Sequence, residues 1–359
     1  MKLYRTPSRE LVCYNKKVMS KIKILARLAA ATQLLPIMEG GEELLVGGQA
    51  VIEGIMMRSP HSYCISIRKP DGEIVSTRKS IQRPSEKHHF FKWPLLRGLG
   101  TLGQALTLGV ISLKFSTDTM IQSEMEKEAA AKSGAAAPAS GEKQQAEIPG
   151  WMMAVNILVS VGFFIGFYKF LPLLLTTELQ KFFPIIGNHF VFNLADGVVR
   201  LLLFLGFLWL LSLWSEMHRL FEYHGAEHKT VFNFESGQDV NVNNARRFIT
   251  LHPRCGTSFM LVIMLISIPV YALVPFDGFV ARLLTRVLLL PLIVALSYEL
   301  IRFAARRQGS LWASLVKPGL WLQKITTQEP SDDQLEIAIH ALDHAMELEK
   351  QQGGELVIA

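Results

Sequence analysis

The sequence predicts an α-helical membrane protein with about four transmembrane helices, a small N-terminal cytoplasmic domain that contains a β-hairpin, and a C-terminal amphipathic helix. Three observations lead to this prediction. The 359 residues are 50% apolar and only 19% charged, whereas soluble domains average about 25% charged residues. Four apolar segments approach the length that a bilayer requires. Basic residues gather on one side of these segments, as they do in proteins with a fixed membrane orientation.

A membrane helix needs ~20 mostly apolar residues, and four segments meet this requirement. The predicted spans cover residues 148–177, 190–215, 255–276 and 279–301. The second contains Asp196 and Arg200, and the fourth contains Arg282, Arg286 and Glu299. We expect these ionisable groups to face the interior of the helix bundle, because charges are costly in lipid. Asp196 and Arg200 stand four residues apart and can neutralise each other as a structural pair.

The loop charges indicate the orientation. The two loops that join the first span to the second and the third to the fourth carry almost no basic residues. The segment between the second and third spans and the exit from the fourth are rich in arginine and lysine: Arg219, Lys229, Arg246, Arg247, Arg254, Arg302, Arg306 and Arg307. Positive charge marks the cytoplasmic side, so both termini and the central loop are predicted to be cytoplasmic.

The remaining segments are assigned from composition and periodicity. They are a basic extension (1–44), a β-rich cytoplasmic domain (45–92), an apolar helix (93–123), a flexible linker (124–147), a central cytoplasmic loop (216–254) and a tail (302–359) with an amphipathic helix over about 332–350. Residues 62–68 and 73–78 are predicted to pair across a turn at 69–72. The apolar helix has three alternative placements: buried, interfacial or partly inserted in the bilayer.

Charge and cysteine content narrow the classes of function. Residues 1–37 contain eight basic residues and one acidic residue, while the rest of the chain is close to neutral. A basic arm on an apolar body is typical of a cytoplasmic segment close to anionic lipid, so the bilayer is the expected partner and nucleic acid is not. The chain has three cysteines, and this odd number suits a reducing, cytosol-facing location.

The central loop contains the densest set of metal-binding side chains. His224, Glu227 and His228 follow the pattern His-x-x-Glu-His. If this segment is helical, the two histidines lie one turn apart on one face with the glutamate beside them. Two imidazoles at this spacing can bind one Zn²⁺, and a neighbouring carboxylate can act as a general base toward water. Glu227 is therefore the candidate catalytic base.

A second motif directly precedes the third span. His252 and Cys255 begin 24 residues after His228, and a returning loop would bring them to the same membrane face. Together with His224 and His228 they would supply four ligands for a divalent metal, with zinc preferred and iron the alternative. Four protein ligands would indicate a structural metal, and an open position would indicate a catalytic one.

Glu53 and Arg58 interrupt an apolar, glycine-containing run at residues 46–60. The run lacks the lysine and hydroxyl residue of a phosphate-binding loop, so nucleotide binding is not expected. One interpretation is a strand with a bulge and a surface ion pair between the two side chains. The other is that Glu53 or Arg58 contributes to the same cytoplasmic site as the histidines.

Four segments together resemble the YqhQ-like family of uncharacterised bacterial membrane proteins. They are residues 47–60, 223–237, 250–258 and 317–330, within a resemblance that extends over roughly 45–349. Residues 1–44 and the alanine-rich linker depart from the family pattern. The resemblance implies an integral protein of the bacterial inner membrane and a suspected metal-dependent enzyme. It places the metal-binding residues of the family at His224, His228, His252 and Cys255.

Three functions remain as alternatives. The first is a metal-dependent hydrolase that acts on a membrane-associated substrate. The second is a non-enzymatic assembly factor for other membrane proteins, with a structural metal and with the basic arm and the amphipathic helix at 332–350 as docking surfaces. The third is a small transporter, which Asp196 within a span would favour, although the sequence has no internal repeat.

Overall fold

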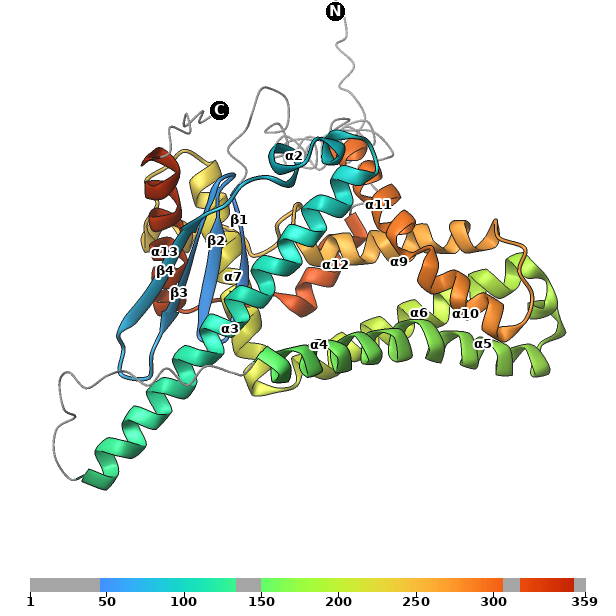
Figure 1. Ribbon diagram of the computed structural model, residues 1–359, viewed down its shortest axis with the longest axis horizontal. Helices are drawn as coiled ribbons and strands as arrows, with labels where there is room; N and C mark the ends of the chain where they lie inside the picture. Colours follow the sequence, from blue (N-terminus) through green and yellow to red (C-terminus); the bar gives the residue numbers. More distant parts are fainter. Residues whose placement is uncertain (1–45, 134–149, 306–316, 352–359) are drawn as a thin grey trace, which may run out of the picture.

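The computed structural model describes residues 46–133, 150–305 and 317–351. A β-sheet with its covering helices forms one part, and a bundle of apolar helices extends from it (Figure 1). The predicted basic extension and most of the predicted linker lie outside the described residues.

The sheet has four antiparallel strands in the order β1-β2-β3-β4. The strands are β1 (Gly47–Val51), β2 (Gly54–Arg58), β3 (Ser62–Arg68) and β4 (Ile74–Ser80). The predicted hairpin is present, because β3 pairs with β4 from Ser62 opposite Ser80 to Arg68 opposite Ile74. The turn at residues 69–72 closes with a hydrogen bond from Gly72 N to Lys69 O, as its Pro-Asp-Gly sequence predicts.

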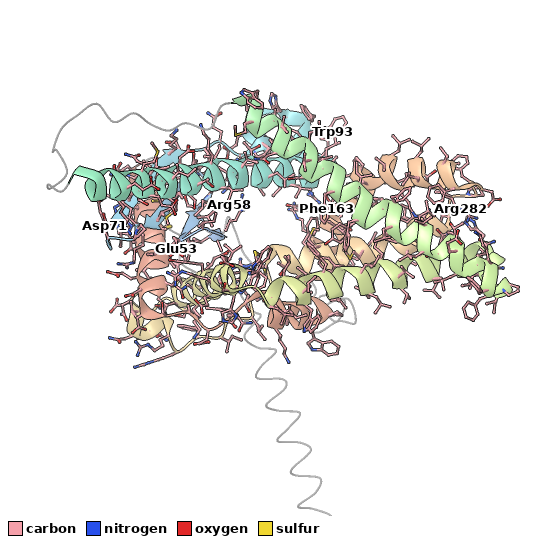
Figure 2. All side chains as sticks on the ribbon, turned by 90° about the horizontal axis from the view of Figure 1, so that it is seen from below. Glu53, Arg58, Asp71, Trp93, Phe163 and Arg282 are labelled. Carbon is pink, nitrogen blue, oxygen red and sulfur yellow. The ribbon has the colours of Figure 1, made fainter. Side chains whose placement is uncertain are left out.

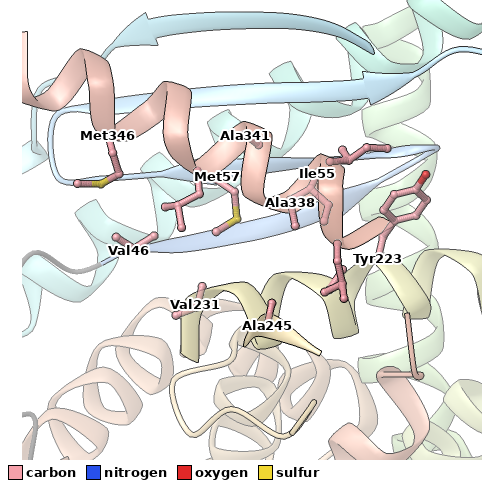
Figure 3. Packing of buried hydrophobic residues seen from close by; sticks show 13 residues of the cluster. Val46, Ile55, Met57, Tyr223, Val231, Ala245, Ala338, Ala341 and Met346 are labelled. Carbon is pink, nitrogen blue, oxygen red and sulfur yellow. The ribbon is translucent and has the colours of Figure 1, made fainter. Parts of the chain in front are cut away.

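Both faces of the sheet are buried. Ile55 and Met57 of β2 belong to a core cluster with Leu342 of α13 (Asp332–Gln351), as Figure 3 illustrates for part of this cluster. Met56, between them, packs in a second cluster with Leu108 of α3 (Leu96–Ser133). Alternate side chains of a strand point to opposite faces. The sheet is therefore the middle layer between α13 and α3.

The amphipathic helix expected over about 332–350 is present as α13. Its apolar side chains are buried in the protein's own core: Leu335, Ile337, Ala338, Ala341, Leu342, Ala345 and Met346. A face that covers the sheet is not available to another protein. The apolar side of α13 therefore packs within this chain, and the role of the helix as a docking surface stays a prediction.

The bundle and its connections consist of helices. They are α2 (Pro84–Lys87), α4 (Gly150–Ile165), α5 (Leu171–Phe182), α6 (His189–Ser212), α7 (Ser215–Glu235), α8 (Val242–Ala245), α9 (Gly256–Ala272), α10 (Phe279–Leu288), α11 (Leu290–Ala305) and α12 (Lys317–Thr326). A single π-turn, Gly166–Phe170, joins α4 to α5. These two helices therefore form one long rod beside α6 (Figure 1).

The described residues contain two helices that are long and apolar enough to cross a membrane, Ala154–Phe182 and His189–Ser212. A third is present if α10 and α11, which meet at a bend of 47°, form one span. Pro291 lies one residue into α11, and a proline there removes a helical hydrogen bond. Helix α9 is apolar but has only 17 residues. The described residues thus contain two or three helices that are long and apolar enough to span a membrane, where the sequence predicts four spans.

Helix α3 replaces two predicted segments. It begins at Leu96 within the apolar segment 93–123 and continues to Ser133, ten residues into the predicted linker. Near its start, Gly98 packs against Tyr298 of α11, and Arg97 Nε donates a hydrogen bond of 2.6 Å to Glu299 Oε1. The helix packs on the sheet and on α11 with one face. On the other face Leu106, Val110 and Leu113 are exposed, so the placement of this segment relative to a bilayer stays a prediction. Glu299, predicted to lie in a span, forms its ion pair with Arg97 within α11, six residues before the helix ends at Ala305.

One buried carboxylate links α13 to the turn before β3. Glu349 Oε2 accepts hydrogen bonds from Ser59 Oγ at 2.6 Å and from His61 N at 2.9 Å, and its Oε1 lies 2.8 Å from His61 Nδ1. Burial opposes ionisation of Glu349, but the hydrogen bonds from Ser59 and His61 outweigh it and lower its pKa. The hydrogen bond to Glu349 is the main reason that the pKa of His61 is raised.

These shifts predict how stability depends on pH. A lowered carboxyl pKa stabilises the fold at neutral pH, and this contribution is lost as the pH falls through the folded-state value, below the ordinary 4.5. A raised histidine pKa stabilises it at acidic pH, and this contribution is lost as the pH rises through the folded-state value, above 6.5. Thermal unfolding from pH 4 to 9 should show a maximum between these limits. The variant Glu349→Gln should flatten the profile and Glu347→Gln should preserve it, and identical profiles for all three proteins would contradict the assignment.

Candidate metal centre

Helix α7 carries both histidines of the central loop. Only Leu213 and Trp214 lie between the end of α6 and the start of α7, and His224 is the tenth residue of α7. The condition set for the two histidines, a helical segment, is met, although the segment 216–254 was assigned as a loop. The rings of His224 and His228 lie one turn apart with their centroids 4.5 Å from each other.

Cys255 completes a group of three donors. One ligand atom from each of His224, His228 and Cys255 lies within 4.8 Å of the other two, and His224 Nε2 is 3.2 Å from Cys255 Sγ. With Zn–N distances of about 2.0 Å and a Zn–S distance of about 2.3 Å, ligand atoms around a tetrahedral zinc are roughly 3.3–3.7 Å apart. The donors therefore need only small movements to share one ion.

Backbone carbonyls orient the two imidazoles. His224 Nδ1 lies 2.8 Å from Thr326 O, and His228 Nδ1 is hydrogen-bonded to Thr250 O. A carbonyl only accepts, so each Nδ1 carries the proton and each Nε2 presents a lone pair to the group. His228 is 2% exposed, and its Nε2 is buried without a hydrogen-bond partner. Metal-binding histidines usually donate one ring N–H to a carbonyl or carboxylate, as both histidines do here. A buried ring nitrogen without a hydrogen bond normally has another partner, such as water or an ion.

Cys255 occupies the N-cap of α9. The positive end of the helix dipole lies at this position and stabilises negative charge on the sulfur. Thr257 Oγ1 is 3.1 Å from the same Sγ. Two imidazoles and one thiol are the donors that zinc and iron prefer, whereas magnesium and calcium prefer oxygen ligands. The residues present therefore fit a transition metal.

His252 lies beside this group but not in it. Its ring centroid is 5.6 Å from that of His228, and its Nε2 faces Glu235 Oε2 at 3.4 Å. Its Nδ1 accepts from Arg254 N at 3.3 Å, so both ring nitrogens have partners. Burial lowers the pKa of His252 to about 4, against an opposing charge on Glu227. The neutral ring packs between His228 and Phe232.

Glu227 points toward the sheet. Its Oε1 accepts a 2.9 Å hydrogen bond from Gly48 N of β1, and the side chain is 9% exposed. Burial lowers the pKa of Arg58, and the nearby charges of Glu227 and Tyr298 oppose this shift. Arg58 therefore lies in the electrostatic field of Glu227, next to the site.

Glu53 belongs to a different group. It has a positive φ of 53° in the turn between β1 and β2 and pairs with Arg219, whose Nη2 lies 2.6 Å from Glu53 Oε2. Tyr223 OH also donates to this oxygen at 3.3 Å. One interpretation of the sequence was a surface ion pair between Glu53 and Arg58. In the structure Glu53, in the turn between β1 and β2, pairs instead with Arg219 of α7.

Gln323 of α12 is the residue that the sequence interpretation missed. Its Oε1 accepts from His252 N at 2.7 Å, and its Nε2 donates to His252 O at 2.7 Å and to Ser258 Oγ at 2.8 Å. It is completely buried and holds the loop before Cys255 in place. The sequence feature that could have identified Gln323 is its position within the family motif at 317–330. The carbonyls of Thr250 and Thr326 have no side-chain signature, so no pattern marks them.

Gly225 permits the close approach that brings Thr326 to the site. A Cβ on Gly225 would lie 2.0 Å from the carbonyl oxygen of Gln328, which no real contact permits. Gln328 N donates a 2.9 Å hydrogen bond to Phe221 O on the same helix. The backbone of α7 and that of the segment after α12 are thus in direct contact.

The variant Gly225→Ala should therefore separate these two segments. We expect a loss of about 1–3 kcal/mol in the free energy of unfolding, the usual cost of overpacking a rigid interior. Gly206→Ala is the matched control, because nothing lies within 4 Å of a Cβ at that helical position. Chemical denaturation in detergent measures both variants. Equal midpoints for Gly225→Ala and the wild type would contradict the described contact.

Residues 93–348 match the family described as "Protein of unknown function (DUF1385)". The chain is also 31% identical over 305 residues to the "Uncharacterized protein YqhQ" of Bacillus subtilis (strain 168), an alignment that covers 84% of this chain and 92% of the relative. No solved structure matches the chain. The resemblance noted from the motifs is confirmed, and the chain belongs to the DUF1385 family of YqhQ-like proteins.

Proposed function

We propose that the protein is a metal-dependent hydrolase of the bacterial inner membrane, with zinc bound by His224, His228 and Cys255. The observation that carries this proposal is the buried Nε2 of His228, which has no hydrogen-bond partner and belongs to a group of three converging ligand atoms. An apolar core would not retain such an atom without compensation. A metal ion at the centre of the group would provide it.

Three protein ligands favour catalysis over a purely structural role. Structural zinc sites use four protein ligands, whereas catalytic sites use three and leave one position for water or substrate. Zinc bound in this way supplies Lewis-acid activation of water. Glu227 is the base in this proposal. Gly48 N donates a hydrogen bond to one oxygen of its carboxylate, and the charge of Arg58 interacts with it.

The substrate class follows from the distance to the membrane. We propose four spans, formed by α4 with α5, by α6, by α9 and by α10 with α11, with both termini in the cytoplasm. His224 follows the end of α6 by twelve residues, and a helix rises 1.5 Å per residue, so the site lies about 18 Å along the chain from the span. This favours a substrate anchored in the bilayer or attached to a lipid.

The metal is tested by elemental analysis of protein purified in detergent without chelator. We expect about one zinc or iron per chain in the wild type, and loss of it in His228→Ala and Cys255→Ala. His252→Gln is the matched control, because its ring has other partners, and it should keep the metal. A folded wild type without metal would refute the site. Loss of metal in His252→Gln would instead make His252 a fourth ligand and favour a structural role.

Catalysis is tested separately with Glu227→Gln. Removal of a general base costs about 10²–10⁴ in rate, so this variant should keep its metal and lose hydrolysis. Glu216→Gln, at an exposed position on the same helix, is the control that should retain both. The probes are nitrophenyl esters, nitrophenyl phosphodiesters and extracted membrane lipids. Unchanged hydrolysis in Glu227→Gln would remove this residue from the mechanism.

The second candidate function is a non-enzymatic assembly factor with a structural metal. One observation favours it: the donors and their carbonyl supports come from three separate segments, α7, the loop at 250–255 and the end of α12. A metal there would join these segments whatever else the protein does. Metal retention together with unchanged cellular function in Glu227→Gln would favour this alternative.

A further inference from the structure

The helix bundle buries more positive than negative charge. Lys169, Arg200 and Arg286 are 5%, 2% and 2% exposed, and Asp196 is completely buried. They come from the π-turn before α5, from α6 and from α10, and they converge around Tyr271 of α9. Among the described residues, this group thus combines three basic side chains with one carboxylate.

The contacts of Asp196 account for only part of this charge. It pairs with Arg200 and, at 3.2 Å, with Arg286. Lys169 Nζ donates to Tyr271 OH at 3.1 Å, so its partner is neutral. Arg200 Nε and Asp196 Oδ1 are buried without hydrogen-bond partners. Burying an ion costs several kcal/mol unless an opposite charge offsets it. The group is therefore short of negative charge.

A small pocket lies at the edge of this charged group, at the end of the bundle away from the sheet, where Figure 2 labels Arg282. Its volume is about 10 Å³, enough for one water-sized group. The polar side chains that line it are His189, Asn193, Tyr271, Arg282, Thr285 and Arg286. Two arginines one turn apart on α10 thus face the same small space.

The two guanidinium groups are held in place on one ring. Arg282 and Arg286 lie 4.0 Å and 6.0 Å from the centroid of Phe192, which is 1% exposed. Arg282 donates from Nη2 to Asp277 at 2.9 Å, but its Nε is buried without a partner. An unpaired donor beside a second, fully buried arginine is a preorganised anion site, because guanidinium groups match oxyanions and halides in charge and geometry.

We infer that the pocket between Arg282 and Arg286 binds a small anion, either a free halide-sized ion or the phosphate oxygen of a lipid headgroup inserted from the membrane surface. The anion offsets the excess positive charge of the buried group and occupies the unpaired Nε of Arg282. This site lies on α10, at the end of the bundle away from α7 and the candidate metal centre, and does not depend on it (Figure 1).

The test measures chloride binding to the full chain in dodecyl maltoside. Binding is detected as broadening of the ³⁵Cl NMR signal. Wild type should broaden the signal in a saturable way. Arg282→Gln, which changes a side chain that is 17% exposed, should abolish the saturable part. Lys181→Gln, on the surface at the same end and paired with Glu178, is the matched control and should bind like wild type. Asp196→Asn should bind about tenfold more tightly, because it removes the competing carboxylate.

Added phosphatidylglycerol distinguishes the two sources of the anion. Displacement of chloride by this lipid, but not by neutral phosphatidylcholine, identifies a headgroup phosphate as the occupant, and no displacement identifies a free ion. Both results support the site. The absence of saturable broadening in wild type, or equal broadening in Arg282→Gln and Lys181→Gln, would overturn it. Unfolding midpoints of each variant establish that a loss of binding is not a loss of fold.

Discussion

The direct contact between the backbone of α7 and the segment after α12 is the constraint on which the sheet-containing part of the protein and the candidate metal centre depend. Gly225 leaves room for the carbonyl of Gln328, and Gln328 N is bonded to Phe221 O. This contact fixes Thr326 O beside His224. The opposite side of α7 contributes Tyr223 and Ala226, among others, to the core beneath the sheet. One helix therefore connects the core, the metal centre and the membrane bundle.

Local patterns were sufficient to predict much of this arrangement. The hairpin at 62–80 follows from alternation and turn chemistry, and α13 follows from its apolar periodicity. The spacing of His224 and His228 predicted neighbouring rings, and the loop length to Cys255 allowed a return to the same place. These features depend on residues close in sequence or on one short connection.

Other features could not be predicted because they depend on tertiary contacts. One of the two interpretations of the sequence paired Glu53 with Arg58, but Glu53, in a turn with positive φ, pairs with Arg219, more than 160 residues away in the chain. Apolar content alone predicted the fourth span, whereas the bend between α10 and α11 divides it. The role of His252 is set by Glu235 and by the backbone of Arg254, neither of which a ligand motif reveals.

The polar interior of the bundle could also be predicted only in part, because some of its contacts join residues that are far apart in the sequence. Asp196 and Arg200 form the predicted i,i+4 pair, as their spacing implies. Lys169 appears in the sequence as a single charge within the first predicted span, and nothing local indicates that it lies near Arg200 and Arg286. Lys169, Arg200 and Arg286 come from separate helical segments and all lie near the ring of Tyr271. Charges that are far apart in the sequence therefore interact with one another.

The position of α13 has a consequence for biosynthesis. The four strands, at residues 47–80, leave the ribosome first, while the helix that covers Ser62 and Ser66 on one face of the sheet is made more than 250 residues later. Until then one face of the sheet has no permanent cover, and all apolar helices of the bundle are translated in the interval. Completion of the part that contains the sheet is thereby coupled to completion of the helix bundle. A chain interrupted before residue 332 would expose apolar sheet surface, the feature that chaperones and proteases recognise in unfinished proteins.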